Sequence, residues 1–286
     1  MINNKLVYDV GLHLGYDTKL YLSKGYKVVA IEANPNLTNL INGQFSRYIK
    51  ENKLTLLNVA VANTDSGIVP FYISQTGSER SSLQKIMAER KGEVTKIDIR
   101  TRTLSSLFEE FGTPYYCKID IEGYDYIALD SLIGSDNRPQ FISAELNNVS
   151  IDGGQVSEEI TNIDQLYPIW FLILEKLKTL GYSKFKIVEQ ASLRVLSRQM
   201  LQRNVFFQNG SLISRIKNRL NRIWTCFSFK PALNKGYFSD CSGPFGESLA
   251  GEWVDFDEAK QIIISFGQQM HNRGINVLWC DIHATN

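Results

Sequence analysis

Two acidic residues and two glycines near the N-terminus have the types and spacing needed to bind a nucleoside. Asp9 lies within a short apolar run at residues 6–10, Gly11 and Gly15 follow that run, and Glu32 ends the next apolar run. Glycine lets backbone approach a ligand closely, and a loop that leads into a helix presents free N–H groups to it. An acid at the end of a second strand can accept hydrogen bonds from two ribose hydroxyls.

The spacing of these glycines favours one class of cofactor. Folds that bind nicotinamide dinucleotides use G-x-G-x-x-G to bring backbone against a pyrophosphate. The segment here is instead Asp9-x-Gly11-x-x-x-Gly15. A looser loop next to an acid suits a cofactor that carries an amino acid and a nucleoside but no phosphate. We therefore expect S-adenosylmethionine, with a purely structural glycine turn as the alternative.

A second group of charged residues follows a later apolar run. Lys118, Asp120 and Glu122 alternate with isoleucines, so they share one face if the strand stays extended. Three charges on one face of a central strand are costly unless they are paired or bound to something. A salt bridge from Lys118, with the acids capping the next helix, is the structural alternative to a catalytic role.

The elements that must position these residues alternate along the chain. Expected strands cover residues 6–10, 27–31, 54–61, 115–121, 139–146, 185–189 and 276–282. Expected helices cover residues 18–24, 104–111, 124–132 and 170–180, with Gly25 ending the first; 69–73 suits an added strand or hairpin arm, and 74–92 a loop and a polar helix. Strands separated by helices predict a mostly parallel sheet, with ligands at the carboxyl ends of its strands.

Composition is that of a globular enzyme rather than a membrane or fibrous protein. The 286 residues are 43% hydrophobic and 21% charged, with a net charge of +1. This length suits one large α/β domain with an insertion. No signal-peptide pattern is present and no apolar run is long enough to span a bilayer. The four cysteines form no C-x-x-C pair, which indicates reduced thiols and a cytoplasmic location.

Six short motifs occur in the order seen in FkbM-type methyltransferases, and together they cover about residues 5–146. They are Asp9-Val-Gly11-x-x-x-Gly15, Ile31-Glu-Ala-Asn-Pro35, Asn58-Val-Ala-Val61, Ser81-Ser-Leu83, Thr103-Leu104 and Lys118-Ile-Asp-Ile-Glu-Gly-Tyr124. The chain resembles this family, which transfers methyl from S-adenosylmethionine, mostly to hydroxyl oxygens of sugars and natural products. It departs at His13, where the family often has Asn, and at Ser105, where the family tends to have Asp.

The resemblance implies a fold, a cofactor site and a base. The fold would be Rossmann-like, of the class I methyltransferase kind, with a seven-stranded, mostly parallel sheet and an antiparallel last strand. The cofactor would be bound by Asp9, Gly11, Gly15, Glu32, Asn34, Asn63 and Ser82. Asp120 would lie near the reacting centre and accept the proton of the acceptor hydroxyl, with Glu122 and His13 as less favoured candidates.

Some small-molecule O-methyltransferases also hold a divalent cation at the ends of the fourth and fifth strands. Asp120, Glu145 and Asn147 occupy comparable places and offer oxygen ligands. Their spacing is not a metal signature, so they remain weak candidates and we expect no metal.

The second half of the chain is expected to contain an insertion. Residues 1–189 and 275–286 would form the methyltransferase domain, and residues 190–274 would cap the substrate site, because the sixth strand ends and the seventh begins on the cofactor side. The same topology places Asp281 and His283 at the far end of the last strand, where structural roles are expected.

The expected insertion is strongly basic. Nine Lys and Arg residues and no acid lie between Gln190 and Lys235. Within a helix expected at residues 211–224, Arg215, Arg219 and Arg222 cluster on one side. They suit recognition of an anionic acceptor such as a phosphate- or carboxylate-bearing glycan; a solvated face and contact with an anionic membrane surface are the alternatives. Nucleic acid is not expected, because no aromatic-interleaved motif accompanies the charge.

A glycine-rich segment follows at residues 243–253. Its Phe245 and Trp253 suit stacking on a sugar ring, or packing of the loop onto the domain. From sequence, an O-methyltransferase is favoured over a nicotinamide-dependent oxidoreductase and over a non-catalytic binding protein with a methyltransferase fold. The acceptor and the oligomeric state stay open.

Overall fold

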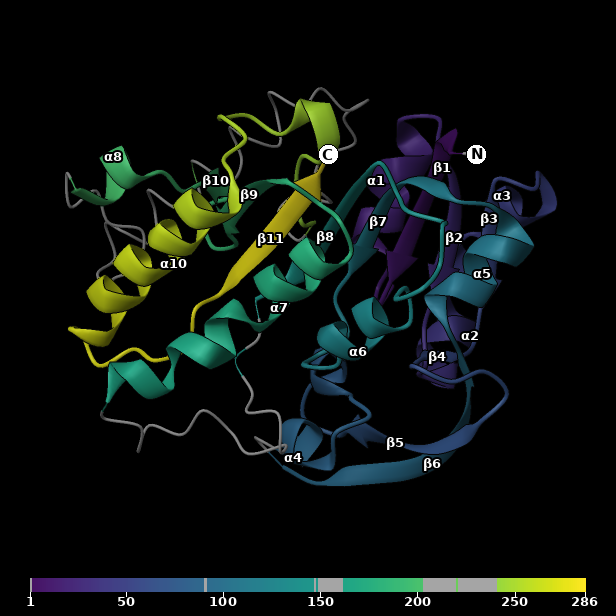
Figure 1. Cartoon of the computed structure of the whole chain (residues 1–286). Helices are drawn as coiled ribbons and strands as arrows, with labels where there is room; N and C mark the ends of the chain where they lie inside the picture. The colour runs from purple at the N-terminus through teal and green to yellow at the C-terminus, as the bar shows by residue number, and fades with distance from the viewer. Residues whose placement is uncertain (1, 90–91, 147, 149–161, 203–219, 221–240) are drawn as a thin grey trace. The chain divides into compact units, whose positions relative to one another are not determined.

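The computed structural model describes residues 2–89, 92–146, 148, 162–202, 220 and 241–286 (Figure 1). The chain divides into two compact units, and the described residues up to Ile142 belong to the first and those from Ser143 onward to the second. Each unit is α/β in character, and each is described separately below.

The first unit contains a parallel sheet. Its strand order is β3 (Leu54–Leu57), β2 (Lys27–Ile31), β1 (Asn3–Val10) and β7 (Pro114–Ile119), with every neighbouring pair parallel. Its helices are α1 (Tyr16–Ser23), α2 (Pro35–Gln44), α3 (Ser46–Lys50), α5 (Leu104–Phe111) and α6 (Asp125–Asp130). Because these strands run in one direction, the residues that follow β1, β2 and β7 meet at one edge of the sheet.

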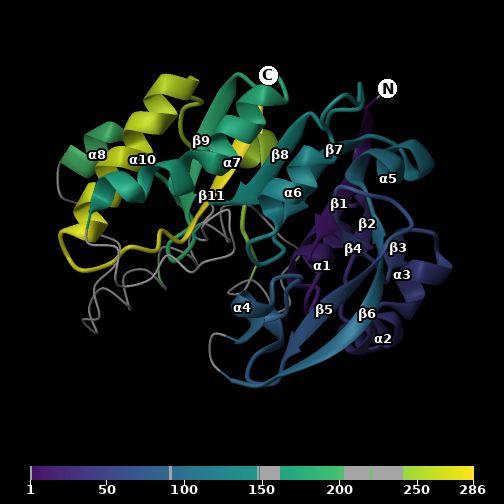
Figure 2. The same ribbon diagram turned by 60° about the horizontal axis from the view of Figure 1, so that its bottom comes forward.

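A smaller sheet belongs to the same unit. Strand β6 (Val94–Arg102) pairs antiparallel with β5 (Ile68–Ser74) and parallel with the short β4 (Ala60–Val61). Figure 2 shows β5 and β6 as a long pair. Its buried side chains include Phe71, Ile73 and Ile99, which form a cluster with Ala60. The expected hairpin arm at 69–73 is therefore present, and its partner β6 was not predicted.

Two predictions in this region were wrong. The continuous strand at 54–61 is split into β3 and β4, which lie in different sheets. The amide of Asn58 explains the break, since it donates to the carbonyl oxygens of Glu32 and Ala33 at 2.8 and 3.1 Å. The polar helix within 74–92 is reduced, among the described residues, to a 3₁₀ turn, η1 (Ser78–Arg80), and a short helix, α4 (Lys85–Ala88).

The predicted strand at 115–121 also ends early. β7 stops at Ile119, and Glu122 and Gly123 adopt positive φ angles of 53° and 82°. A left-handed residue breaks the alternation of an extended strand. The expectation that Lys118, Asp120 and Glu122 share one strand face is therefore wrong for Glu122.

The second unit has antiparallel pairing. Its strands follow the order β8 (Phe141–Glu145, at the junction with the first unit), β11 (Cys280–Thr285), β9 (Lys184–Glu189) and β10 (Arg194–Val195). β11 pairs antiparallel with β9, as expected for the last strand. Helices α7 (Tyr167–Thr179) and α10 (Phe256–His271) pack together, α10 on β9 and α7 on β11 (Figure 1). The short elements are η3 (Ile163–Gln165), α8 (Arg198–Gln202) and η4 (Gly246–Ser248). Counted together, the parallel strands of the first unit and the strands of the second number eight among the described residues, one more than the seven predicted. The additional strand is the short β10.

The last strand begins later than predicted. Residues 276–279 are not in β11, because the side chain of Asn148 donates to the carbonyl of Leu278 at 2.9 Å and accepts from its N–H at 2.9 Å. Asp281 and His283 are buried within the strand rather than at its far end. Helix α10 lies inside the predicted insertion, and the capping role of residues 190–274 stays a prediction.

Candidate functional site

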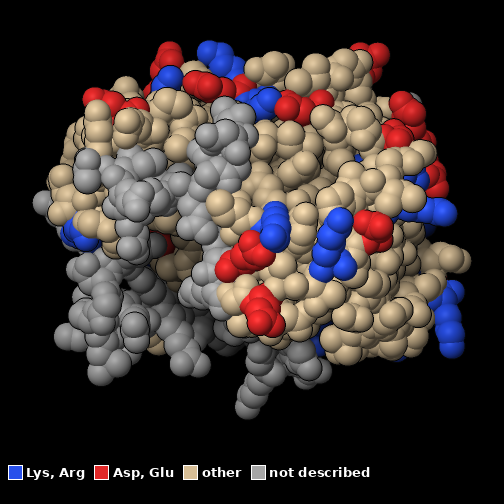
Figure 3. Space-filling view, turned by 90° about the horizontal axis from the view of Figure 1, so that it is seen from below, with Lys and Arg blue, Asp and Glu red and all other residues tan. Residues whose placement is uncertain are grey.

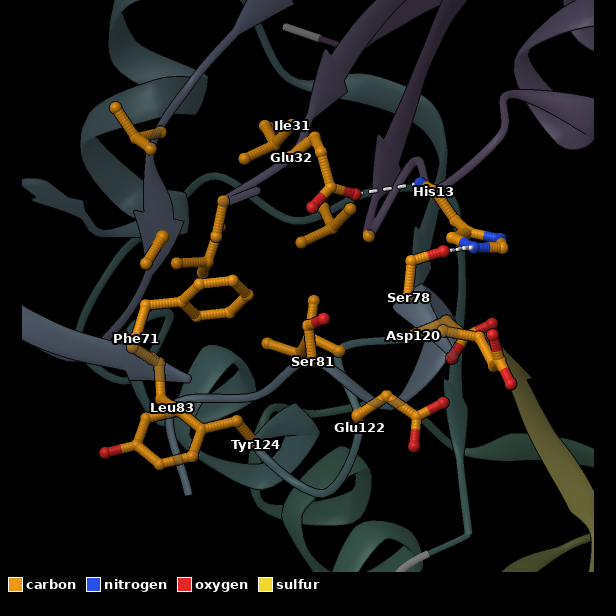
Figure 4. A pocket seen from close by; sticks show the side chains of 18 residues that line it. His13, Ile31, Glu32, Phe71, Ser78, Ser81, Leu83, Asp120, Glu122 and Tyr124 are labelled. Atoms are coloured by element: carbon orange, nitrogen blue, oxygen red, sulfur yellow. Dashed lines mark hydrogen bonds between the residues drawn. The ribbon is translucent and has the colours of Figure 1, made fainter. Parts of the chain in front are cut away.

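A pocket opens in the first unit where β1, β2 and β7 end (Figure 4). The residues that line it come from the ends of these strands, from the small sheet and from the turn before α6. They are Val10, Gly11, His13, Ile31, Glu32, Ala33, Val59, Ala60, Val61, Phe71, Ser78, Glu79, Ser81, Leu83, Asp120, Ile121, Glu122 and Tyr124. The motif around Gly11, predicted to bind the cofactor, and the motif around Asp120, predicted to supply the base, therefore line the same cavity.

Gly11 is required by a contact within the protein. Its φ is +87°, and a Cβ built on it would lie 1.8 Å from the carbonyl oxygen of Asp120. The N–H of Asp120 in turn donates to the carbonyl of Val10 at 2.9 Å. Gly11 thus lets the ends of β1 and β7 touch, whereas the sequence suggested that it makes room for a ligand.

Glu32 is held by two backbone donors. Its Oε2 accepts from the N–H of His13 and its Oε1 from the N–H of Asn34, both at 2.8 Å. Burial raises the pKa of Glu32, and these N–H donors act against that rise. Each carboxylate oxygen has a second lone pair, so both oxygens keep acceptor capacity toward the pocket. This is the geometry expected of a carboxylate that binds two hydroxyls.

His13 connects the glycine loop to η1, on the side of the pocket that the smaller sheet forms. Its backbone is left-handed, with φ 50°, and its Nε2 lies 2.9 Å from Oγ of Ser78 in η1 (Figure 4). Burial lowers the pKa of His13, which favours a neutral ring near pH 7. The hydrogen bond to Ser78 occupies Nε2, so the ring serves to join two walls of the pocket.

Lys118 is surrounded by three carboxylates. Its Nζ lies 3.1 Å from Asp120 Oδ2, 3.2 Å from Asp17 Oδ2 and 3.9 Å from Asp9 Oδ1. Burial alone would lower the pKa of Lys118, but Asp120, Asp17 and Asp9 together raise it well above its usual value. The salt bridge considered from the sequence is therefore present, and it reaches residues of β1 and α1 that the sequence did not connect to Lys118.

Glu122 lines the pocket from a strained turn. Ser82 Oγ donates to its carbonyl oxygen at 3.0 Å, and Gln84 Nε2 donates to that of Gly123 at 3.3 Å. Ser82 is fully buried and is not among the lining residues, so it supports this turn instead of facing the cavity. Its neighbour Ser81 does face the cavity.

Four other predicted cofactor residues are not among those that line the pocket. Gly15 is the left-handed residue, with φ 76°, at the N-terminus of α1. Asp9 is buried behind the pocket wall, Asn34 caps α2 through its side chain, and Asn63 is exposed in the turn after β4. Phe71, Val59 and Tyr124, which do line the pocket, were missed. Phe71 gave no local signal because its strand faces the pocket only through the pairing of β5 with β6.

Comparison with known proteins supplies the family. The model of the methyltransferase FkbM domain matches residues 9–183, more than half of the chain. The chain belongs to the FkbM methyltransferase family. The resemblance found in the sequence is thereby confirmed, and the family supports a methyltransferase over a nicotinamide-dependent oxidoreductase.

Solved structures similar to this FkbM family member include three, of which two align with about two thirds of the chain and one with nearly all of it. An FkbM methyltransferase from Methylobacillus flagellatus KT is 14% identical over 65% of this chain and 40% of its own, with a TM-score of 0.40. Precorrin-6y C5,15-methyltransferase from Geobacter metallireducens GS-15 is 12% identical over 66% and 69%, with a TM-score of 0.31. The MccD protein is 10% identical over 99% and 90%, with a TM-score of 0.36. None of the curated proteins matches the chain.

Two of the acceptor residues predicted for this FkbM chain, Phe245 and Trp253, are described and belong to the second unit. Phe245 is buried, which is the packing alternative considered from the sequence. Trp253 is half-buried, and Nζ of Lys186 lies 4.4 Å from its ring centre while donating to the carbonyl of Leu249. Arg215, Arg219 and Arg222 lie outside the described residues. On the face shown in Figure 3, the described Lys and Arg residues are interspersed with Asp and Glu.

Neither a membrane-spanning helix nor a cluster of metal ligands is present in the described part of this FkbM chain. No helix in that part of the chain is both long and apolar enough to cross a membrane. No group of three His, Cys, Asp or Glu side chains in those same ranges is arranged to hold a metal ion. Of the weak metal candidates, Asp120 is paired with Lys118, Glu145 ends β8, and Asn147 lies outside the described residues.

Proposed function

We propose that the pocket of the first unit binds S-adenosylmethionine and that the chain transfers its methyl group to a hydroxyl oxygen. The observation that carries this proposal is the carboxylate of Glu32, which two backbone N–H groups hold at the pocket with acceptor capacity left on both oxygens. A ribose offers two neighbouring hydroxyl donors to such a group. Membership of the FkbM family supports the same cofactor.

The two sides of the pocket differ in chemistry, and this difference fits the cofactor. Phe71 and Leu83 form an apolar side, whereas Asp120 and His13 lie on the other (Figure 4). An apolar wall suits a purine ring, and an acidic wall suits a cation. The cofactor supplies a methyl group on a cationic sulfur, and the transfer leaves a neutral thioether.

Asp120 is the base that we propose for the acceptor hydroxyl. Its side chain is 32% exposed and lines the pocket, while Lys118 Nζ holds Oδ2 at 3.1 Å. The ammonium orients the carboxylate without covering it. Asp120 would accept the proton that the hydroxyl loses as its oxygen gains the methyl group, which is ordinary general-base catalysis.

The cofactor assignment is tested by calorimetry with S-adenosylhomocysteine, with NAD as the competing ligand. We expect binding of the first alone. Glu32→Gln should weaken it about 10- to 100-fold, the effect of losing a charged hydrogen-bond acceptor. Glu109→Gln, an exposed glutamate on α5, is the matched control and should bind as the parent does. Unchanged affinity in a folded Glu32→Gln protein would overturn the assignment.

For the acceptor, we propose a hydroxyl of a sugar, glycan or natural product that carries an anionic group. The support is the run of nine basic residues between Gln190 and Lys235 without an acid. Reversing Arg215, Arg219 and Arg222 to Glu should raise KM for such an acceptor and leave the Kd of S-adenosylhomocysteine unchanged. If the variant lost only its binding to anionic lipid vesicles, the basic residues would have a membrane-facing role. If the parent protein methylated none of a broad panel of acceptors, a non-catalytic binding protein would be favoured.

A further inference from the structure

Resting on the proposed cofactor, we propose that Asp9 and Asp17, which lie behind the pocket wall, make the pocket prefer a positively charged ligand over a neutral one. The preference would separate S-adenosylmethionine from the thioether that remains after methyl transfer. Both residues act through Lys118 and are positioning residues in this account.

The carboxylates around Lys118 outnumber its single positive charge. Three carboxylates, those of Asp9, Asp17 and Asp120, lie within 4 Å of the Nζ of Lys118. When all four groups are ionised, the cluster carries three negative charges and one positive, a net charge of −2. The ion pairs therefore join every carboxylate to the same ammonium and leave most of the negative charge uncompensated.

Burial of the cluster makes this charge imbalance costly. The side chains of Asp9, Asp17 and Lys118 are 0%, 9% and 7% exposed. Thr18 donates to Asp9 Oδ2 at 2.7 Å, but Asp9 Oδ1 is buried without a hydrogen bond from any described residue. Burial raises the pKa of Asp9 to about 7 against the lowering effect of Lys118. A cation bound nearby would relieve this cost.

Asp120 connects the buried cluster to the pocket. Asp120 belongs to the cluster and also lines the cavity. If Lys118 paired with Asp120 alone, the charges of that pair would cancel. Because Asp17 and Asp9 share the ammonium, the pocket wall keeps a negative potential. The site would thus hold a sulfonium more tightly than a thioether, which also favours release of the spent cofactor.

The test compares the Kd values of S-adenosylmethionine and S-adenosylhomocysteine by calorimetry, with no acceptor present. Asp17→Asn should reduce the preference for the charged ligand on the order of tenfold, as expected when one buried negative charge is removed from the cluster behind the wall. Asp9→Asn should change the preference in the same direction. Asp17→Glu keeps the negative charge and should retain most of the preference for the charged ligand.

Asp98→Asn is the matched control, because it removes one negative charge from an exposed position on β6 and should leave the ratio unchanged. If Asp17→Asn fails to fold, Asp9→Asn carries the test. An unchanged ratio, or an equal loss of affinity for both ligands, overturns the inference and leaves the cofactor assignment standing. If the parent protein binds neither ligand, the proposed function itself is wrong.

Discussion

The carbonyl oxygen of Asp120 lies 1.8 Å from the position that a Cβ of Gly11 would occupy. This contact joins the residue after β1 to the residue after β7, so the glycine loop and the proposed base are placed by the same backbone approach. The hydrogen bond from the N–H of Asp120 to the carbonyl of Val10 reinforces it. The site is therefore sensitive to any side chain at position 11.

Gly11→Ala should destabilise the first unit and weaken cofactor binding together, since the added methyl must displace the Asp120 backbone. Gly25→Ala is the matched control: its φ is also positive, at +84°, but nothing lies within 4 Å of the added Cβ. The control should lose about 1–2 kcal/mol of unfolding free energy from the left-handed conformation alone. Urea unfolding should show a clearly larger loss for Gly11→Ala. Equal losses would mean that the contact with Asp120 does not matter.

Asp9→Asn should stabilise the protein increasingly as the pH rises. Burial raises the pKa of Asp9 from 3.8 to about 7, so the folded state holds a proton that the unfolded state loses first. When folding raises the pKa of an acid, the free energy of unfolding falls as the pH rises from the unfolded pKa to the folded pKa. For Asp9 this loss of stability is complete above pH 7. Asparagine has no such penalty, so the Tm of the variant relative to the parent should rise between pH 4 and 7. A difference that is constant with pH would contradict the assignment.

His13→Asn and Ser78→Ala should be coupled in stability. Asparagine tolerates the left-handed backbone of position 13 and keeps the N–H that Glu32 accepts, but it removes the ring that lies 2.9 Å from Ser78. A double-mutant cycle by urea unfolding should give a coupling of about 0.5–1.5 kcal/mol. The Kd of S-adenosylhomocysteine should change little, because the bond to Glu32 is retained. A large loss of affinity in His13→Asn would show that the ring contacts the ligand.

Asp120→Asn should lower turnover by about 10²–10⁴-fold with any acceptor that the parent accepts, as expected when a general base is removed. The amide keeps the size of the side chain, so cofactor affinity should fall much less than turnover. Kd by calorimetry and kcat by product formation separate the two effects. Turnover within a few fold of the parent would assign Asp120 to the Lys118 cluster alone.

Sequence alone determined those elements whose signals are local. Strand β2 at 27–31 and helix α5 at 104–111 have the predicted bounds, and Gly25 follows the end of α1 with the positive φ that a stop requires. The pairing of a glycine loop with an acid at the end of the next strand was also recognisable. These features depend on the types of residues close together in the sequence and on their spacing, so contacts with distant parts of the chain are not needed to form them.

The tertiary structure decided where the chain departs from local pattern. The run at 54–61 is mostly apolar, but its Asn58 donates to the carbonyl oxygens of Glu32 and Ala33, which follow β2, and breaks the strand. Phe71 reaches the pocket only because β5 pairs with β6, where its partner Ile97 lies 26 residues later in the chain. Lys118 meets Asp9 and Asp17, about a hundred residues away, because β1 and β7 are neighbours. Contacts between distant segments leave no periodicity in either segment, so only the folded chain reveals them.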